Sequence, residues 1–570
     1  MSRYTGGKGK RAGQKKRQQT ETVAESVHFF MATVLDLMVC FYMLMILVVM
    51  PFFYRDGFTR IGTDKAYFFQ QCNRYAYWCL FPVLVLYLVA GAVVFVQKKG
   101  FSAIRTWRPK WSATDSFALA YGISLILSYL CSDYKREAWM GADGWFMGFV
   151  PQLTLVGIYF VVSRTWKKKD VIVGAILPVS AVVFLLGILN RFAVYPIDMK
   201  LENPYFISTI GNINWYCGYL TTVFFAGLVF FWQTDHNQPW WKLLLALYTA
   251  IGSVALVTQG SSSGLVAAAV VLFVMFGLSA GDQQRMQAFW EVVTVFSVSC
   301  LILWLVQALG WAQVNFRDAA VTLFTDGTTA VVMTIMSFVV LACVTYTKKK
   351  GTYPERFFRR LSRIAIAAAI TGVALSALLI TVNTASGGRI SQAMGLPAEN
   401  PLMLSSNWGS NRGVTWKAAV MCFAQQDFLH KLVGTGPDCM AAFLYNGGSE
   451  ELIAMVKEVF GASRLTNAHN EWLTLLVDVG LLGCISFVGM MGTAAVRFLK
   501  AGIVLKAGNQ GGRAGMILLA CGFCVLAYTA NNVFSFQQSM NVSTMFVILG
   551  IGENYLRAGQ TTVTKGGKAK

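Results

Sequence analysis

Uninterrupted apolar stretches of about 20 residues recur along most of this chain, and each is long enough to cross the ~30 Å hydrocarbon core of a bilayer as a helix. The clearest runs from His28 to Tyr54, with Asp36 as the only charged residue between its ends. The composition agrees, because 55% of the residues are hydrophobic and 13% are charged, against about 45–50% and 25% in ordinary soluble domains. The sequence therefore predicts an all-α, polytopic membrane protein.

The hydropathy pattern predicts about 14 transmembrane helices. The expected spans are residues 29–53, 76–96, 115–132, 145–163, 171–190, 212–232, 240–258, 262–279, 288–309, 328–346, 363–382, 470–496, 514–534 and 539–555. They divide the chain into a basic tail (1–27), an eleven-span membrane region (28–382), a large loop (383–469), a three-span membrane region (470–556) and a second basic tail (557–570).

The net charge of +21 is explained by topology better than by nucleic-acid binding, because the basic residues are spread over many loops. Most of the 48 lysines and arginines fall on one side of an alternating 14-span arrangement. The positive-inside bias makes that side cytoplasmic. We therefore expect a multi-pass protein of the plasma membrane, with both termini in the cytoplasm and residues 383–469 outside.

Cofactor motifs are missing from the sequence. The 12 cysteines are scattered, and Cys521 and Cys524 form a C-x-x-C pair without the second pair or histidine that a zinc site needs. Neither a G-x-x-x-x-G-K-[ST] loop nor a G-x-G-x-x-G turn between a strand and a helix occurs. We expect no metal and no nucleotide cofactor.

The large loop holds residues suited to an anionic ligand. Two stretches in it, 413–428 and 450–460, have helix-like patterns, so we expect a folded segment. Among its cations are Arg389 and Arg412. A guanidinium stays charged and binds phosphate oxygens with two parallel hydrogen bonds, so a phosphate ligand is one interpretation; solvated loop charges are the other.

Two motifs at the end of this loop carry a resemblance to a known family. They are KLVGTGPDCMAAF (431–443) and NAHNEWLTLLVDVGLLG (467–483). They resemble the bacterial O-antigen ligase and O-antigen polymerase superfamily, whose members show a Gly-x-Gly-Pro turn and then His-Asn, nine residues and Gly-x-x-Gly. NRGVTWKAAV (411–420) is similar to the family's arginine followed four residues later by a bulky apolar residue, and GNINWYCGYL (211–220) is similar to an earlier Gly-Asn-x-Asn signature.

The resemblance implies a C-type glycosyltransferase-like membrane enzyme that works without a metal. Such enzymes transfer glycan from an undecaprenyl diphosphate carrier in the outer leaflet to a hydroxyl of another glycan or, in some members, of a protein. The motifs do not separate ligase from polymerase.

The resemblance also suggests roles for individual residues. His469 accepts the proton of the acceptor hydroxyl or orients it, as an imidazole of pKa about 6.5 is able to do, and Arg412 binds the leaving diphosphate. Asn470 holds the imidazole or a sugar hydroxyl. Gly434, Gly436 and Pro437 are further candidates for substrate binding.

Two further expectations concern the surroundings of these residues. If residues 468–483 form one helix, its first amides face the phosphate, and Asp478 lies deeper on nearly the opposite face, in a structural hydrogen bond. Many relatives carry an arginine midway along the chain where this sequence reads TQGSSSGLV (258–266). Arg389 or Arg191 are candidates for the missing charge.

Two other classes of function stay open. A flippase or transporter of lipid-linked glycans would also span the membrane many times, but it favours internal repeats and charged or broken helices at mid-membrane. A non-catalytic scaffold would have no requirement for His469. Loss or retention of glycan transfer on mutating His469 separates these classes from an enzyme.

Overall fold

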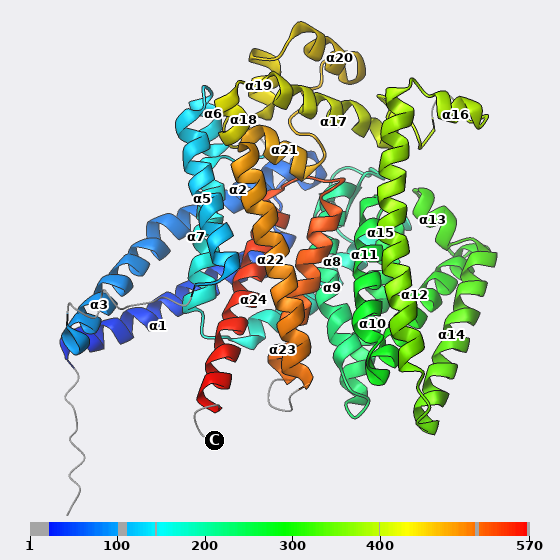
Figure 1. The fold of residues 1–570 in the computed structure, drawn as a ribbon, viewed down its shortest axis with the longest axis horizontal. Coiled ribbons are helices and arrows are strands. Elements are labelled where there is room, and N and C mark those ends of the chain that lie inside the picture. Colours follow the sequence, from blue (N-terminus) through cyan, green and yellow to red (C-terminus); the bar gives the residue numbers. More distant parts are fainter. Residues whose placement is uncertain (1–21, 101–110, 143–144, 398–399, 508–511, 567–570) are drawn as a thin grey trace, which may run out of the picture.

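The computed structural model describes residues 22–100, 111–142, 145–397, 400–507 and 512–566, and helices make up 78% of it (Figure 1). The only sheet in these ranges is an antiparallel pair, β1 (Phe206–Ile207) and β2 (Gly211–Asn212). The first 21 residues of the basic N-terminal tail, most of the basic 97–114 loop and the last four residues lie outside the described ranges. The expectations for those segments stay predictions.

Eleven helices among the described residues are long and apolar enough to cross a membrane, as expected for an all-α polytopic membrane protein. They are Val23–Phe52 (α1, Val23–Leu44, with the turns that follow it), Ile61–Lys99 (α2, Ile61–Tyr75, and α3, Phe81–Lys99, joined by a π-helical turn), α5 (Ala113–Cys131), α8 (Asp170–Arg191), α9 (Ile213–Gln233), α10 (Pro239–Thr258), α12 (Gln283–Ala308), α14 (Gly327–Lys350), α15 (Glu355–Ala385), α22 (Gly480–Ala507) and α23 (Gly512–Asn531).

The other three expected spans coincide with helices that do not meet this criterion of length and hydropathy. They are α7 (Phe149–Thr165), α11 (Ser263–Ser279) and α24 (Ser539–Gly566). The number 14 therefore stays a prediction. Helix α24 also continues to Gly566, into the region expected to be a basic tail.

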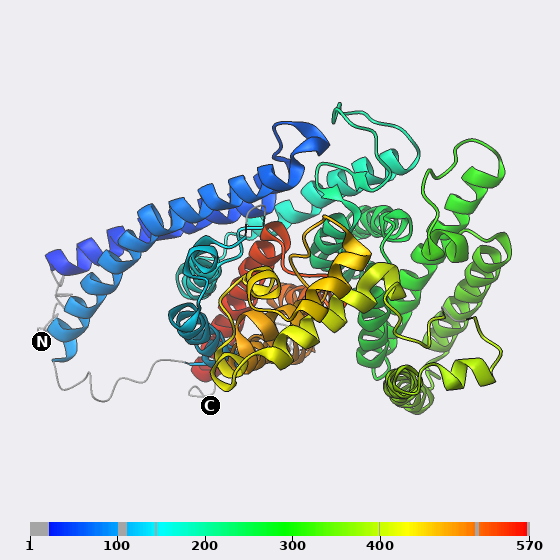
Figure 2. The same ribbon diagram turned by 90° about the horizontal axis from the view of Figure 1, so that it is seen from above.

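Helices α9 and α23 form the centre of the bundle, since 83% and 78% of their most apolar windows are buried. By contrast, α15 stands at the periphery with none of its window buried. Helices α1 and α3 pack on each other and project from the side of the bundle (Figures 1 and 2).

Residues 386–470, which we call the cap, lie at the end of the bundle opposite to the C-terminus (Figure 1). The cap contains α16 (Arg389–Ala393), α17 (Trp408–Gln425), α18 (Phe428–Val433), α19 (Met440–Asn446) and α20 (Glu450–Phe460). It has an apolar core of its own, built around Cys422, Leu444 and Leu452. The helix expected at 450–460 is confirmed, whereas the one expected at 413–428 ends at Gln425.

The expectation of one helix over residues 468–483 is wrong. Helix α21 (Glu471–Asp478) ends before α22, and Gly480, the first residue of α22, has φ 66°. The carbonyls of Val477 and Asp478 accept N–H groups of Thr435 and Gly436, both at 3.0 Å. The helix breaks because the Gly-x-Gly-Pro turn takes up the carbonyls that its next turn would use.

Candidate active site

Arg412 stands at the start of the regular part of α17. The three residues before it, Gly409 to Asn411, have φ of 59°, 61° and 68°, a left-handed run that L-residues rarely adopt. The guanidinium of Arg412 donates from Nε to the Phe534 carbonyl (3.2 Å) and from Nη1 to the Gly409 carbonyl (3.0 Å). No carboxylate of the described residues lies within 4 Å of it, so its charge has no anionic partner.

His469 lies just ahead of α21 in a strained backbone conformation, with φ 48°. Its N–H donates to Asn467 Oδ1 (3.0 Å), and its ring meets the edge of the Phe536 ring with centroids 5.0 Å apart. Within the part of the chain that the structure describes, the two ring nitrogens have no hydrogen-bond partner. Burial and then the charge of Arg412 lower the pKa of His469 to about 4, so the imidazole is neutral at pH 7 and has a free lone pair, but it is a weaker base than an ordinary histidine.

Arg412 and His469 share one supporting segment, the stretch from Phe534 to Phe536 that follows α23. Arg412 lies against Phe534, with its guanidinium carbon 5.9 Å from the ring centre, and His469 lies against Phe536. The Thr415 hydroxyl, one turn after Arg412, donates to the carbonyl of Ala468 (2.8 Å) and so ties α17 to the His469 backbone. The structure thus brings the two predicted catalytic residues to one place.

Asn470 has no hydrogen bond to the His469 ring among the described residues, and its expected contact with a sugar hydroxyl stays a prediction. Its side chain caps α21, where Oδ1 accepts the N–H of Leu473 (3.0 Å). The amide that supports His469 belongs instead to Asn467, which the sequence analysis passed over because it lies outside the His-Asn pair.

Gly434, Gly436 and Pro437 are buried; Gly434 packs on backbone and Gly436 on the side chains of Ser132 and Cys439. A Cβ on Gly434 would lie 2.2 Å from the Asp478 carbonyl oxygen, and a Cβ on Gly480 would lie 2.4 Å from that of Leu432. The two glycine motifs are therefore each other's packing partners, and direct substrate contact is not proposed for them.

Asp478 completes this junction by accepting the N–H groups of Cys439 (3.1 Å) and Met440 (2.7 Å) at the start of α19. Its hydrogen bonds are structural, as the sequence predicts. Because α21 and α22 are separate helices, Asp478 lies at the end of α21, and its hydrogen bonds are made to the start of α19.

Arg191 ends α8 and is fully buried. It donates to the carbonyls of Pro204 (2.5 Å) and Gln259 (2.7 Å), beside the serine turn where a cation was missing. The hydroxyl of Ser263, in that turn, lies 3.4 Å from the thiol of Cys217. The charge of Arg412 acts on the same thiol. Arg191 therefore supports the turn from behind and is covered from solvent.

Arg389 does not join this site. It is exposed and lies on α16, which packs on α15 at the side of the bundle away from α21 (Figures 1 and 2). Two arginines were candidates for the missing mid-chain charge. Arg191 lies beside the serine turn, whereas Arg389 lies far from it.

The aromatic residues around the site were partly missed by the sequence analysis. Phe536 meets Trp145 edge to face at 4.9 Å, and Trp145 meets Trp215 in the same way at 5.8 Å. Trp215 belongs to the Gly-Asn-x-Asn stretch, but Phe534 and Phe536 match no motif. The signal that points to them is their position, two aromatics in the short turn directly after a span.

Asp438 holds the loop that carries Trp145. Its Oδ2 accepts the N–H groups of Ala142 (2.8 Å) and Met147 (3.1 Å). Burial raises the pKa of Asp438 to about 7. Within the described residues, no group of three or more histidines, cysteines and acidic residues is arranged to hold a metal ion.

Comparisons with known proteins add no family to this geometry. No protein-family model and no curated protein matches the chain.

Proposed function

We propose that this protein is a membrane glycosyltransferase that passes glycan from an undecaprenyl-diphosphate-linked donor to a hydroxyl of an acceptor glycan or protein. The supporting observation is that a neutral imidazole, His469, and a cation without a carboxylate partner, Arg412, meet on the segment 534–536. The motif resemblance to O-antigen ligases and polymerases gives the same residues the same roles. The enzyme would thus serve the synthesis of cell-surface polysaccharide.

The proposed reaction needs two groups, one at each end of the bond that is exchanged. The acceptor oxygen attacks C1 of the donor sugar while its proton moves to the free ring nitrogen of His469. The bond from C1 to the diphosphate oxygen breaks, and the diphosphate leaves with its negative charge held by Arg412. The products are the new glycoside and undecaprenyl diphosphate.

The proposed orientation puts the cap outside the cell and the C-terminus inside. Cysteine labelling of intact cells tests it with two exposed positions, Ser463 in the cap and Thr352 after α14, each compared with the unmodified protein. We expect a membrane-impermeant maleimide to label Ser463→Cys in intact cells and Thr352→Cys only after permeabilisation. The reverse pattern would put the site in the cytoplasm and end this proposal.

The decisive experiment is a transfer assay with purified protein, lipid-linked donor and acceptor glycan. We expect His469→Ala to lower kcat by about 10²–10⁴-fold, the usual contribution of a positioned base. His430→Ala is the matched control, because His430 lies at the same end but its ring is engaged by Asp427 and the Cys131 carbonyl. Full activity of a well-folded His469→Ala variant would refute the mechanism, and lipid-linked glycan translocation without transfer would favour a flippase.

A further inference from the structure

A small cavity opens at the cap end of the bundle, beside Trp145. It lies between α2, the loop before α7, the start of α9 and the start of α24, and has a volume of about 20 Å³. Its walls include the rings of Trp145 and Trp215 and the polar residues Lys65, Gln538 and Ser539.

Lys65 brings a buried amino group to this cavity. Its side chain is 4% exposed, and Nζ donates to the carbonyls of Met50 (2.7 Å) and Pro51 (2.9 Å). The ammonium form has three donors, so in that form one donor is left for an anion. The neighbouring Asp64 is occupied by Arg55 (3.0 Å), and no carboxylate of the described residues lies within 4 Å of Nζ.

Gln538 adds a second donor that has nothing to bind. It is 5% exposed, its Oε1 accepts from Asn541 (2.9 Å), and its buried Nε2 has no partner. A buried donor left unsatisfied costs free energy, and a buried charge without a partner costs more. Two such donors lining one cavity fit the oxygens of an anion.

The cavity is connected to the candidate active site by a row of aromatic rings. From His469 the row runs through Phe536 and Trp145 to Trp215, with successive centroids 5.0, 4.9 and 5.8 Å apart. Trp145 and Trp215 are each partly exposed, so they offer apolar ring surface beside a few polar groups, the usual lining of a small-molecule site.

We infer that this cavity binds an anionic group, a carboxylate or a phosphate, carried on the glycan that enters the active site, so that the substrate is an acidic glycan. The inference rests on the proposed function, because it assumes that the same glycan reaches His469. The cavity has room for little more than one water-sized group, which suits the edge of a single anionic substituent while its sugar ring lies on the tryptophans.

The donor's own diphosphate is a poor fit to Lys65. Helix α9 separates the two places: Trp215 contacts the Lys65 cavity, while Cys217 lies near Arg412. Residues two apart on a helix point about 200° apart. A diphosphate held by Arg412 therefore lies on the other side of α9 from Lys65.

Binding of soluble oligosaccharides to the full-length protein in lipid nanodiscs tests the inference. The probes are a galacturonic acid trisaccharide, a neutral galactose trisaccharide of the same size, and the pair glucose 6-phosphate and glucose, which separates phosphate from carboxylate. We expect at least one acidic probe to bind about tenfold or more tightly than its neutral partner, since hydrogen bonds to charged groups are the stronger ones. Equal affinities in both pairs would overturn the inference.

Gln538→Glu is the sharpest variant. It places a carboxylate on a second residue that lines the cavity with Lys65, so the protein would carry its own anion. We expect the preference for acidic probes to disappear while the melting temperature stays the same or rises. Lys65→Met should also abolish the preference, and Lys135→Met, at an exposed lysine of α6 (Lys135–Met140), should leave it intact. Preference retained in both Gln538→Glu and Lys65→Met would overturn the inference.

Transfer assays with neutral and acidic lipid-linked donors separate this inference from the proposed function. A loss in Gln538→Glu that is at least tenfold larger for acidic donors supports it. An equal loss of transfer activity for both donors would indicate that Lys65 binds the diphosphate of the donor, and it would overturn the inference. If no donor is transferred but the acidic probes still bind through Lys65, the proposed function fails and the anion site stands.

Discussion

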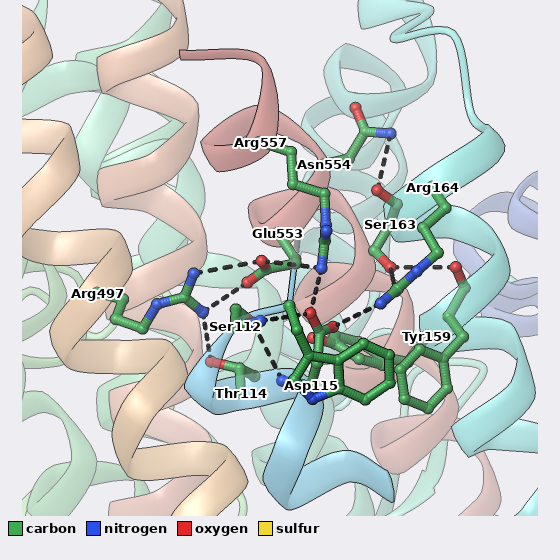
Figure 3. Close-up of polar contacts among 12 residues, drawn as sticks. Ser112, Thr114, Asp115, Tyr159, Ser163, Arg164, Arg497, Glu553, Asn554 and Arg557 are labelled. Carbon is green, nitrogen blue, oxygen red and sulfur yellow. Dashed lines mark hydrogen bonds and ion pairs between the residues drawn. The ribbon is translucent and has the colours of Figure 1, made fainter. Parts of the chain in front are cut away.

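Two groups of basic residues, one near each end of the bundle, have opposite surroundings. At the cap end, Arg412, Arg191 and Lys65 donate to backbone carbonyls, and none has a carboxylate within 4 Å among the residues described. Near the C-terminal end, arginines of three helices surround two buried carboxylates, Asp115 and Glu553 (Figure 3).

The second group, which we call the arginine–carboxylate cluster, is closely satisfied. Asp115 accepts from Tyr159 (2.8 Å) and pairs with Arg164 (3.2 Å) and Arg557. Glu553 pairs with Arg497 (2.7 Å), which also donates to Thr114 (2.7 Å). The cluster thereby joins α5, α7, α22 and α24 (Figure 3).

The contrast separates structural charge from charge suited to a ligand. The two members of a buried charge pair neutralise each other inside the protein. Removing one member leaves the other charge buried in an apolar environment without a partner. A cation that faces only carbonyls keeps most of its attraction for an anion from outside. The cap end therefore has the electrostatics of a binding site and the C-terminal end has those of a joint between helices.

The largest expected effect is on catalysis at the cap end. Arg412→Ala should lower kcat about 10²–10³-fold, the usual result of removing one group that stabilises developing charge, with little change in melting temperature. Arg412→Lys should restore only part of it, because a point charge replaces a planar fork. The transfer assay measures both. If Arg412→Ala instead destabilises the protein as much as loss of an arginine from the cluster is expected to, the contrast between the two groups disappears.

At the cluster, the effect should fall on stability. Arg497→Met leaves Glu553, which is 1% exposed, with Arg557 (3.3 Å) as its one remaining cation among the described residues and should cost about 3 kcal/mol. Exchanging both Arg497 and Glu553 for methionine should recover most of that loss, because no buried charge is left unpaired. Unfolding in detergent mixtures measures the cycle, while the kcat of the folded fraction should be unchanged. A double variant less stable than the single one would contradict this account.

The protonation of His469 sharpens the comparison on a smaller scale. Because burial and Arg412 lower the pKa of His469 to about 4, its imidazole stays neutral down to about pH 5, where an ordinary histidine of pKa about 6.5 is mostly protonated. In a variant with the other three histidines replaced by glutamine, diethyl pyrocarbonate should modify His469 nearly as fast at pH 5 as at pH 7. Adding Arg412→Gln should raise the pKa of His469, so that the modification rate falls more between pH 7 and pH 5. If the modification rate of the variant that keeps only His469 instead has a midpoint near pH 6.5, burial and Arg412 do not lower the pKa of His469.

The smallest effect is expected for an exposed pair. Arg359 and Glu355 on α15 are 2.6 Å apart, but their side chains are 53% and 49% exposed. Solvent screens such pairs, so Glu355→Gln should change stability by less than about 0.5 kcal/mol. A loss as large as that of Arg497→Met would show that pairing, and not burial, sets the strength of the cluster.

The sequence alone predicted the positions of the apolar helices, because hydropathy is a local property that each span carries by itself. It also predicted α20 from its own periodicity, and it singled out His469 and Arg412 through short motifs. It did not show that Asn470 caps α21. It also joined α21 to α22, because the partner that separates them is a turn more than 40 residues earlier in the chain.

What the tertiary structure decided is which side chains have partners. Whether Arg389 or Arg191 lies near Arg412, and whether Asp115 or Lys65 is neutralised, depends on contacts between helices far apart in the chain: Asp115 pairs with Arg557, while Lys65 meets only carbonyls. A residue's type gives its charge, and that can be read from the sequence. The balance between that charge and its surroundings is set by packing, and in this protein that balance distinguishes the arginines and lysine suited to binding an anion from those that hold helices together.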